Sequence, residues 1–360
     1  MSTTARPQAA LDRKTIARID PSDQLTDVLA LPEHLRDALW KVESAALEPW
    51  DSPGGLIVAG MGGSAVGGSL ARAILGDHAS RPLLAARAYG LPPWTTSDTT
   101  VLCSSYSGNT EETLACYEAA GVIGATRVVV TAGGRLAELA RAERVPVVPV
   151  AGGLQPRAAV AYMTVAALEV AAVCGVGPGM NSEIDVAAEH LEQLVIEWGP
   201  EGADDSDVKV LARALHGTVP IIAGAGLTTP IAQRFKAQVN ENAKSPSYAV
   251  ELPELDHNEI VGWDSVQEFG RFSAVFLDDC DTHPRIKERM ELTARLIAPG
   301  AAGVHRVHSR GQTAVERVFS LVLLADLASI YLAALRGIDP AVVEAIDRLK
   351  AELAGGGGQA

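Results

Sequence analysis

The chain has 360 residues, of which 48% are hydrophobic and 21% charged, and its formal net charge at pH 7 is −14. This length allows two domains with a core each, and the composition is that of a globular protein. The acidic balance argues against non-specific binding to nucleic acid or to an anionic membrane, because both require a basic surface. A small anionic ligand is compatible with this charge, since a local site can be positive in an acidic protein.

The cysteines and the apolar segments predict a cytoplasmic protein without a membrane span. None of the four cysteines belongs to a CxxC pair, and three lie in apolar surroundings, as free thiols of a reducing compartment do. Residues 1–16 lack the apolar core of a signal peptide. The most apolar stretch, residues 318–335, is interrupted by Asp326 and therefore predicts a buried helix.

The first half of the chain alternates short apolar strands with helical patterns. Residues 1–50 are predicted to be mostly helical. Strands are predicted at residues 56–59, 83–86, 101–103, 127–131 and 145–150, and helices at 68–75, 111–120 and 158–174. Such an alternation is typical of a mostly parallel sheet that is covered on both faces.

The second half partly repeats this pattern. Strands are predicted at residues 219–223, 272–277 and 303–307, and helices at 230–243, 284–297 and 313–335. Because each half closes with a long apolar helix, we predict two similar α/β domains. The predicted organisation is an N-terminal helical segment (1–50), a first domain (51–181), a helical linker (182–207), a second domain (208–336) and a C-terminal tail (337–360).

A hydroxyl-rich loop, Ser105-Tyr-Ser-Gly-Asn-Thr110, lies between the strand that ends at Cys103 and the next predicted helix. A helix N-terminus carries unpaired N–H groups and a partial positive charge, and so attracts phosphate. An N-cap with a glutamate three positions later would explain only one hydroxyl. The presence of Ser105, Ser107 and Thr110 together with Gly108 therefore predicts a phosphate site.

A glycine-rich loop follows the first predicted strand. From Gly60 it fits the dinucleotide pattern G-x-G-x-x-G/A, but the second strand ends near Arg87 without the acidic residue that binds ribose. Arg87 could accept a 2′-phosphate, so an NADP-dependent oxidoreductase stays an alternative. Ser64, after Gly62 and Gly63, is expected at the same sheet edge as the hydroxyl-rich loop. Two such loops side by side suit one compact phosphate better than a pyrophosphate.

Together, Gly60-Met-Gly-Gly-Ser64 and Ser105-Tyr-Ser-Gly-Asn-Thr110 resemble the sugar isomerase (SIS) domain, which binds phosphosugars in enzymes and in regulators. With three further strings, the chain resembles the bifunctional phosphoglucose/phosphomannose isomerases over nearly its whole length after about residue 30. Those strings are QPRAA at 155–159, VNENAK at 239–244 and ELDHNE at 254–259, followed by a C-terminal match at 339–350. The resemblance implies an α/β fold of two tandem SIS-type α-β-α sandwiches with mostly parallel sheets, an N-terminal helical segment and a C-terminal helical tail. The phosphate site that it implies consists of Gly62, Gly63, Ser64, Ser105, Ser107 and Thr110.

The resemblance also implies catalytic roles for four residues. Glu241 would be the base that moves a proton between C1 and C2 of the sugar, and Arg157 would stabilise the negative oxygen of an enediolate. His257 would help to open the sugar ring by proton transfer at the ring oxygen. Lys350, in the tail, would fold back over the sugar and assist ring opening.

The implied reaction interconverts glucose 6-phosphate or mannose 6-phosphate with fructose 6-phosphate through a cis-enediol, without a metal or another cofactor. The implied partner is a second copy of the chain, a homodimer in which His257 reaches the site of the other subunit. The chain departs from the family at one point: family members often carry Thr-Pro after Asp-Pro, whereas this chain has Ala341-Val342. A hydroxyl near the sugar is therefore missing.

Other functions are open to the same motifs. A non-catalytic phosphosugar-binding regulator would need the phosphate loop but no base, so Glu241, His257 and Arg157 favour the isomerase. A glutamine-dependent aminotransferase is disfavoured, because no N-terminal domain with a cysteine nucleophile is recognised in the sequence. His305 and His308 have HxxH spacing, but on a strand they would point to opposite faces, which argues against a metal site.

Overall fold

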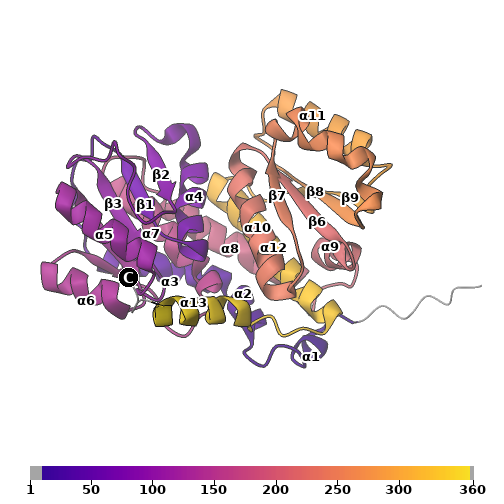
Figure 1. The fold of residues 1–360 in the computed structure, drawn as a ribbon, viewed down its shortest axis with the longest axis horizontal. Helices are drawn as coiled ribbons and strands as arrows, with labels where there is room; N and C mark the ends of the chain where they lie inside the picture. The colour runs from indigo at the N-terminus through magenta and orange to yellow at the C-terminus, as the bar shows by residue number, and fades with distance from the viewer. Residues whose placement is uncertain (1–9, 357–360) are drawn as a thin grey trace, which may run out of the picture.

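The computed structural model describes residues 10–356. Two parallel sheets lie side by side, one in each half of the molecule, with a layer of helices between them (Figure 1). Three N-terminal helices precede the first sheet: α1 (Arg13–Ile16), α2 (Gln24–Leu29) and α3 (Leu31–Ser44). The predicted helical character of this segment is therefore confirmed for its described part.

The first sheet has five parallel strands in the order β2-β1-β3-β4-β5. The strands are β1 (Leu56–Ala59), β2 (Leu83–Ala86), β3 (Thr100–Ser104), β4 (Thr126–Thr131) and β5 (Val147–Pro149). Its helices are α4 (Gly62–Leu75), α5 (Glu111–Ile123), α6 (Gly134–Glu143) and α7 (Val160–Val173), the last preceded by the 3-10 turn η2 (Pro156–Ala159). Strand residues alternate between two cores, because Leu56 and Val58 belong to one cluster and Ile57 and Ala59 to another.

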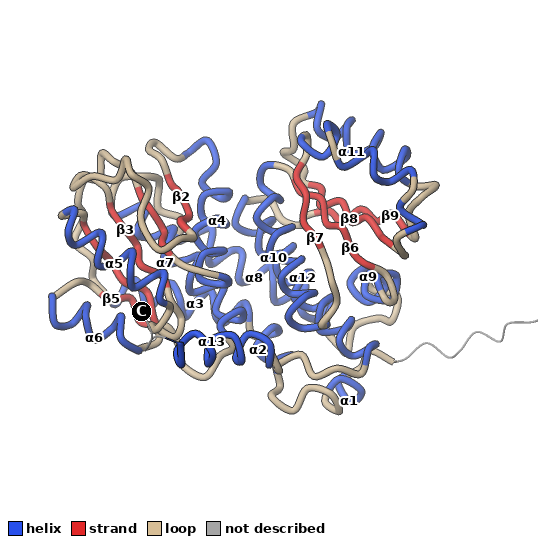
Figure 2. The backbone as a smooth tube through the Cα atoms, in the orientation of Figure 1, coloured by secondary structure: helices blue, strands red, loops and turns tan. Residues whose placement is uncertain are grey.

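The second sheet has four parallel strands in the order β7-β6-β8-β9 (Figure 2). They are β6 (Val219–Gly224), β7 (Tyr248–Glu251), β8 (Phe272–Asp278) and β9 (Gly303–His308). The longer helices of this half and its flanks are α8 (Asn181–Trp198), α9 (Asp207–Leu215), α10 (Thr229–Ala243), α11 (Pro284–Ile297), α12 (Ala314–Arg336) and α13 (Glu344–Gly356). Five further 3-10 turns complete the described chain: η1 (Gly76–His78), η3 (Gly226–Thr228), η4 (Glu254–His257), η5 (Glu259–Asp264) and η6 (Val266–Glu268).

One hydrophobic core runs through both halves and is built mainly by the helices between the sheets. In this layer α4 contacts both α10 and α12, and α12 contacts α8. By length and composition, residues 156–173 and α12 could each cross a membrane, but 78% and 89% of their most apolar 18-residue windows are buried inside the protein. The prediction of a buried helix at residues 318–335 is thus confirmed.

Both sheets change winding direction after their first strand. In the first sheet β1 lies between β2 and β3, and in the second β6 lies between β7 and β8. A ligand crevice forms in such sheets at the carboxyl ends of the two strands that flank the switch. For the first sheet, these ends lead into the glycine-rich loop and the hydroxyl-rich loop.

Two details differ from the expectations. The helix expected from residue 68 begins at Gly62, so Ser64 lies in its first turn rather than in a loop. This early start depends on glycine, since Gly62 has a φ of +51°. Strand β7 was not predicted, because its residues are half-buried or exposed and form no apolar run. The predicted domain boundaries stay predictions.

Candidate active site

Hydrogen bonds connect the glycine-rich loop and the hydroxyl-rich loop at the switch point of the first sheet. The Tyr106 N–H donates to Ser64 Oγ over 3.3 Å, and Ser104 Oγ donates to the Ser64 carbonyl over 3.3 Å. Ser64 is 7% exposed. A hydroxyl in the first turn of α4 therefore lies against the hydroxyl-rich loop, as expected from the shared sheet edge.

The hydroxyls of the second loop bond to one another and to loop N–H groups. Ser105 Oγ lies 2.8 Å from Thr110 Oγ1 and accepts from the Gly108 N–H over 3.1 Å, while Ser107 Oγ accepts from the Asn109 N–H. Thr110 is the N-cap residue of α5, yet its side chain makes no capping bond. The N-cap explanation for this hydroxyl is therefore wrong. Gly108 has a φ of +68°, and a Cβ there would lie 1.8 Å from the Gly133 carbonyl oxygen, so no other residue fits this turn.

The first loop also contacts the segment that carries Arg157. A Cβ on Gly63 would lie 3.0 Å from the Pro156 carbonyl oxygen and 3.4 Å from the Cα of Arg157. The absence of a side chain at Gly63 thus allows the start of α4 to approach η2. Arg157 is consequently placed next to the predicted phosphate loops, although the first of them lies far back along the chain, at the end of β1.

Arg157 and Glu241 form an ion pair between the two halves of the molecule. Nη1 of Arg157 lies 3.5 Å from Oε2 of Glu241, which belongs to the last turn of α10. The arginine side chain is 7% exposed and the glutamate side chain 33% exposed. Burial lowers the pKa of Arg157, and the charge of Glu241 opposes this effect; the guanidinium nevertheless stays protonated at neutral pH.

Lys244 ties the end of α10 to the start of the tail. Its Nζ donates to the carbonyl oxygens of Glu241, Asp339 and Pro340 over 2.7, 2.8 and 3.0 Å. Burial, aided by the positive charge of Arg157, lowers the pKa of Lys244. These bonds keep the segment after α12 beside Glu241.

A cavity of about 530 Å³ opens next to Glu241 and is bounded by the tail. Val342 and Ile346 contribute apolar surface to its wall, and Glu241 and Lys244 contribute polar groups. Of the Ala341-Val342 pair, which stands where Thr-Pro was expected, Val342 lines this cavity and Ala341 is buried. A volume of this size suits a small-molecule ligand such as a phosphorylated hexose.

His257 and Lys350 are not brought to the Arg157–Glu241 pair. His257 ends η4 and is exposed, and Lys350 is exposed on α13. Within residues 10–353, no hydrogen bond or ion pair joins either side chain to Glu241 or Arg157. The tail does turn back, because α13 extends beneath the first half of the molecule in Figure 1.

Comparisons with known proteins identify the family. The model of the bacterial phospho-glucose isomerase C-terminal SIS domain matches residues 204–353. A bifunctional phosphoglucose/phosphomannose isomerase from Caldicellulosiruptor bescii is 40% identical over 302 residues, which cover 83% of this chain and 89% of that protein. The chain belongs to the family of bifunctional phosphoglucose/phosphomannose isomerases.

Two further comparisons agree with this family. A protein of the same name from Aquifex aeolicus is 34% identical over 316 residues, which cover 87% of this chain and 94% of that protein. The solved structure of a hypothetical protein from Thermus thermophilus superposes with a TM-score of 0.75 at 15% identity, covering 97% of this chain and 94% of the other. This structural likeness supports the fold alone, and the predicted class of SIS-type α/β sandwiches is confirmed.

The corresponding loop of the second sheet is acidic rather than hydroxyl-rich. Asp279, Cys280 and Asp281 cluster after β8 with a spacing that could suit a cation. Arg317 already occupies this place, since its Nε and Nη2 bond to Asp279 and Asp281 over 3.0 and 2.6 Å. An arginine between the carboxylates makes metal binding there unfavourable.

Sequence reasoning missed several residues that hold Arg157. Asn242 Oδ1 and the Pro340 carbonyl oxygen each accept a bond of 2.7 Å from its guanidinium, and Gln24 Oε1 accepts one of 3.0 Å. Asn242 and Pro340 lie inside strings that the family resemblance singled out. Gln24 precedes the region of resemblance, so no motif pointed to it.

Proposed function

We propose that the chain is an aldose–ketose isomerase that interconverts glucose 6-phosphate and mannose 6-phosphate with fructose 6-phosphate, without a metal. The observation that carries the proposal is the Arg157–Glu241 pair, a carboxylate and a guanidinium 3.5 Å apart beside a sugar-sized cavity. The names of the relatives from Caldicellulosiruptor bescii and Aquifex aeolicus support the same reaction.

The substrate is anchored by its phosphate. Ser64, Ser105, Ser107 and Thr110, with the N–H groups of Gly62 and Gly63, offer donors at the starts of α4 and α5. The binding energy of this non-reacting end orients C1 and C2 against Glu241. Ring opening is assisted by His257 and Lys350.

The proton transfer is internal to the sugar. Glu241 takes the proton from C2 of the open-chain aldose and returns it to C1, while the hydroxyl proton on O2 moves to O1. Arg157 stabilises the negative oxygen of the cis-enediolate between these steps. Because the enediol is planar at C2, glucose and mannose 6-phosphates lead to one intermediate, and one base serves both.

The test is a coupled assay for fructose 6-phosphate with each aldose phosphate in the presence of a chelator. The parent protein is expected to convert both sugars, and Glu241→Gln is expected to lower kcat about a thousandfold, since positioned acid–base groups contribute at this level. Glu288→Gln, at an exposed position of α11, is the control and should keep the parental rate. An undiminished rate in Glu241→Gln would contradict the mechanism.

The alternative, a non-catalytic phosphosugar-binding regulator, shares the phosphate loops but has no use for a base. It gains support only if a hexose 6-phosphate raises the melting temperature while neither sugar is turned over. Turnover of one sugar alone would retain the isomerase and remove the dual specificity.

The active form in this proposal is a cytoplasmic homodimer in which His257 is supplied across the interface. The segment around His257 exposes Tyr248, Val261 and Phe269, whose large apolar surfaces suit an interface. Refolding a mixture of Glu241→Gln and His257→Ala chains should restore activity, because a mixed dimer has one site with both residues intact. A mixture that stays inactive would contradict the shared site.

The proposed location is the cytoplasm, and recovery of the protein in a membrane or secreted fraction would contradict it.

A further inference from the structure

The guanidinium of Arg157 is held on one side by neutral oxygens. Its Nε donates to Asn242 Oδ1, and its Nη2 donates to both Gln24 Oε1 and the Pro340 carbonyl oxygen. An arginine has five N–H bonds, one on Nε and two on each Nη. These three acceptors use every N–H of Nε and Nη2, which leaves Nη1 as the nitrogen that lies beside Glu241, 3.5 Å from its Oε2.

The oxygens that accept from Nε and Nη2 are neutral, so they do not cancel the positive charge of Arg157. Glu241 is the one carboxylate that forms an ion pair with Arg157 among the described residues. The nearby buried carboxylate of Asp326 is paired with Arg234 and accepts from Gln238. The charge of Arg157 is therefore available to an anionic oxygen on the side of Nη1.

Gln24 is itself fixed in place. It is 4% exposed and is the first residue of α2. The buried carboxylate of Asp20 accepts from the Gln24 N–H over 3.0 Å and from the Leu25 N–H over 2.9 Å. The backbone at the start of α2 is thus held in place, and it presents the Gln24 side chain to Arg157, which lies 133 residues further along the sequence.

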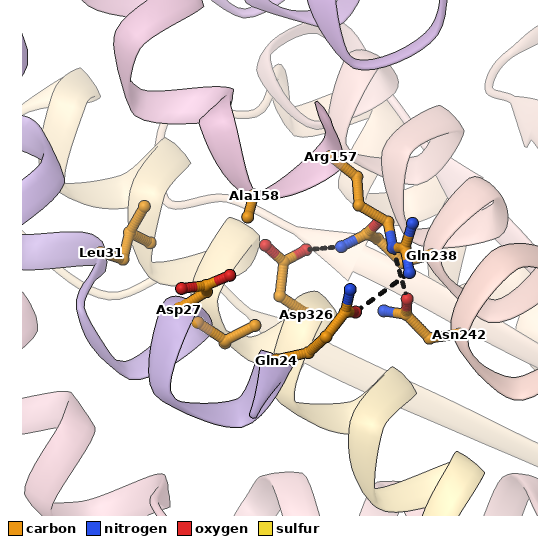
Figure 3. Close-up of a pocket in the computed structure, with 9 residues that line it drawn as sticks. Gln24, Asp27, Leu31, Arg157, Ala158, Gln238, Asn242 and Asp326 are labelled. Carbon is orange, nitrogen blue, oxygen red and sulfur yellow. Dashed lines mark hydrogen bonds between the residues drawn. The ribbon is translucent and has the colours of Figure 1, made fainter. Parts of the chain in front are cut away.

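The orientation of the Gln24 amide follows from its partner. Because Arg157 can only donate, Gln24 must present Oε1 to it, and Nε2 is then buried without a protein acceptor. Figure 3 shows Gln24 and Asn242 converging on Arg157 beside a small cavity of about 10 Å³, a volume suited to one water molecule. A hexose does not fit into a volume of this size, which favours an approach of the substrate to Arg157 from the side of Glu241.

We propose that Gln24 is a positioning residue, which holds Nη2 of Arg157 so that Nη1 faces Glu241 and the oxygen of the reacting sugar. This inference rests on the role proposed above for Arg157. It gives the N-terminal helices a function in the active site in addition to their part in the core. A sugar-phosphate enediolate is the species whose stabilisation would depend on this contact.

Kinetics of three variants test the proposal. Gln24→Leu removes the acceptor at similar volume and is expected to lower kcat about tenfold to a hundredfold with KM changed less than about threefold, since the lost interaction acts in the transition state. Gln24→Glu keeps an acceptor oxygen beside Nη2 but adds a negative charge that cancels part of the charge of Arg157, so its kcat should stay below the parental value. Val28→Ala, in the same helix and on the wall of the same cavity, should lower the melting temperature but leave kcat unchanged. Equal losses of kcat in Gln24→Leu and Val28→Ala, or a parental kcat in Gln24→Leu, would overturn the proposal.

A crystal structure of Gln24→Leu supplies a readout independent of activity. The guanidinium of Arg157 is expected to rotate or to lose order, with Nη1 displaced from Glu241. An unchanged guanidinium would overturn the positioning role. If the parent protein converts no hexose 6-phosphate, the proposed function fails on its own, and the structure of the variant still decides whether Gln24 positions Arg157.

Discussion

The two sheets present the same crevice with different chemistry. Each has a topological switch after its first strand, and each leads there into a helix N-terminus. At the first sheet, Ser64 lies in the first turn of α4 against the loop that carries Ser105 and Thr110. At the second sheet the loop carries Asp279 and Asp281, which both pair with Arg317 and leave one negative charge in excess.

The same crevice therefore differs between the two sheets in the chemistry that its loops offer to a ligand. An anion would be repelled by the carboxylates of the second sheet, whereas it can take hydrogen bonds from the hydroxyls of the first. The second half contributes to the site in another way. The end of α10 brings Glu241 to Arg157, so the proposed base and the predicted phosphate loops come from different halves.

The largest expected effect concerns the acidic loop. Asp279→Asn should lower the free energy of unfolding by about 3 kcal/mol, because it leaves Arg317 buried with a single, exposed carboxylate partner. Isomerase activity per folded molecule should not change. Chemical denaturation and the coupled assay measure the two quantities.

Asp281→Asn is the control for this prediction, since the Asp281 side chain is 73% exposed and the loss of its charge should cost less than about 1 kcal/mol. A loss of activity in Asp279→Asn at full stability would mean that the second crevice also takes part in the reaction.

The next effect compares one substitution at two helix starts. Thr110→Val removes a hydroxyl that makes no capping bond, and should raise KM about tenfold to a hundredfold through the lost phosphate contact, with little change in stability. Thr228→Val removes a buried hydroxyl that accepts from the Ala225 N–H and donates to a backbone carbonyl. It should instead lower the free energy of unfolding by about 1–2 kcal/mol.

Steady-state kinetics and thermal unfolding distinguish these outcomes. If Thr110→Val is saturated by substrate with an unchanged KM, the Thr110 hydroxyl does not contribute to phosphate binding. A raised KM in Thr228→Val would contradict the expectation that only the crevice of the first sheet binds the substrate phosphate.

The smallest effect concerns the long helices that close each half. α12 begins with a capping box of Thr313 and Glu316, whereas α7 has no side-chain cap. Burial alone would raise the pKa of Glu316, but hydrogen bonds from Thr313, His190 and Gln312 outweigh it and lower this pKa below 4.5. A lowered folded-state pKa contributes stability above the unfolded pKa and loses it as the pH falls through the folded one.

Glu316→Gln should therefore cost about 1 kcal/mol at pH 7, and the difference from the parent should shrink as the pH falls below 4.5. Unfolding free energies of both proteins at several pH values measure it. If the difference in unfolding free energy grew on acidification, the pKa of Glu316 would be raised rather than lowered in the folded protein.

The strands and the predicted phosphate loops could be predicted from the sequence because their signals are local. A short apolar run followed by glycine or hydroxyl residues marks a strand and its turn, and each such unit needs only neighbouring residues to be recognised. This held for β1, β2 and α11, whose bounds match the predicted ranges. It failed for β7, whose pairing with β6 comes from tertiary context rather than from an apolar run.

The surroundings of the catalytic candidates were less accessible. Arg157 and Glu241 were singled out by family resemblance, but their contact was not, since they lie in different halves of the chain. Gln24 carried no motif at all. Whether His257 and Lys350 join the site stays a prediction, because both are exposed on the single chain.

By itself the sequence determined the α/β class, the two strand–helix cycles and the hydroxyl-rich turn, because periodicity and turn chemistry act over a few residues. The tertiary structure alone decided that α4 starts early enough to place Ser64 in its first turn, and that Gln24, Asn242 and Pro340 surround one guanidinium. Such contacts join segments far apart in the chain, and they depend on how two halves pack around a common layer of helices. Local patterns carry no information about that packing. The sequence could therefore single out individual site residues, but only the tertiary structure shows which of them lie together.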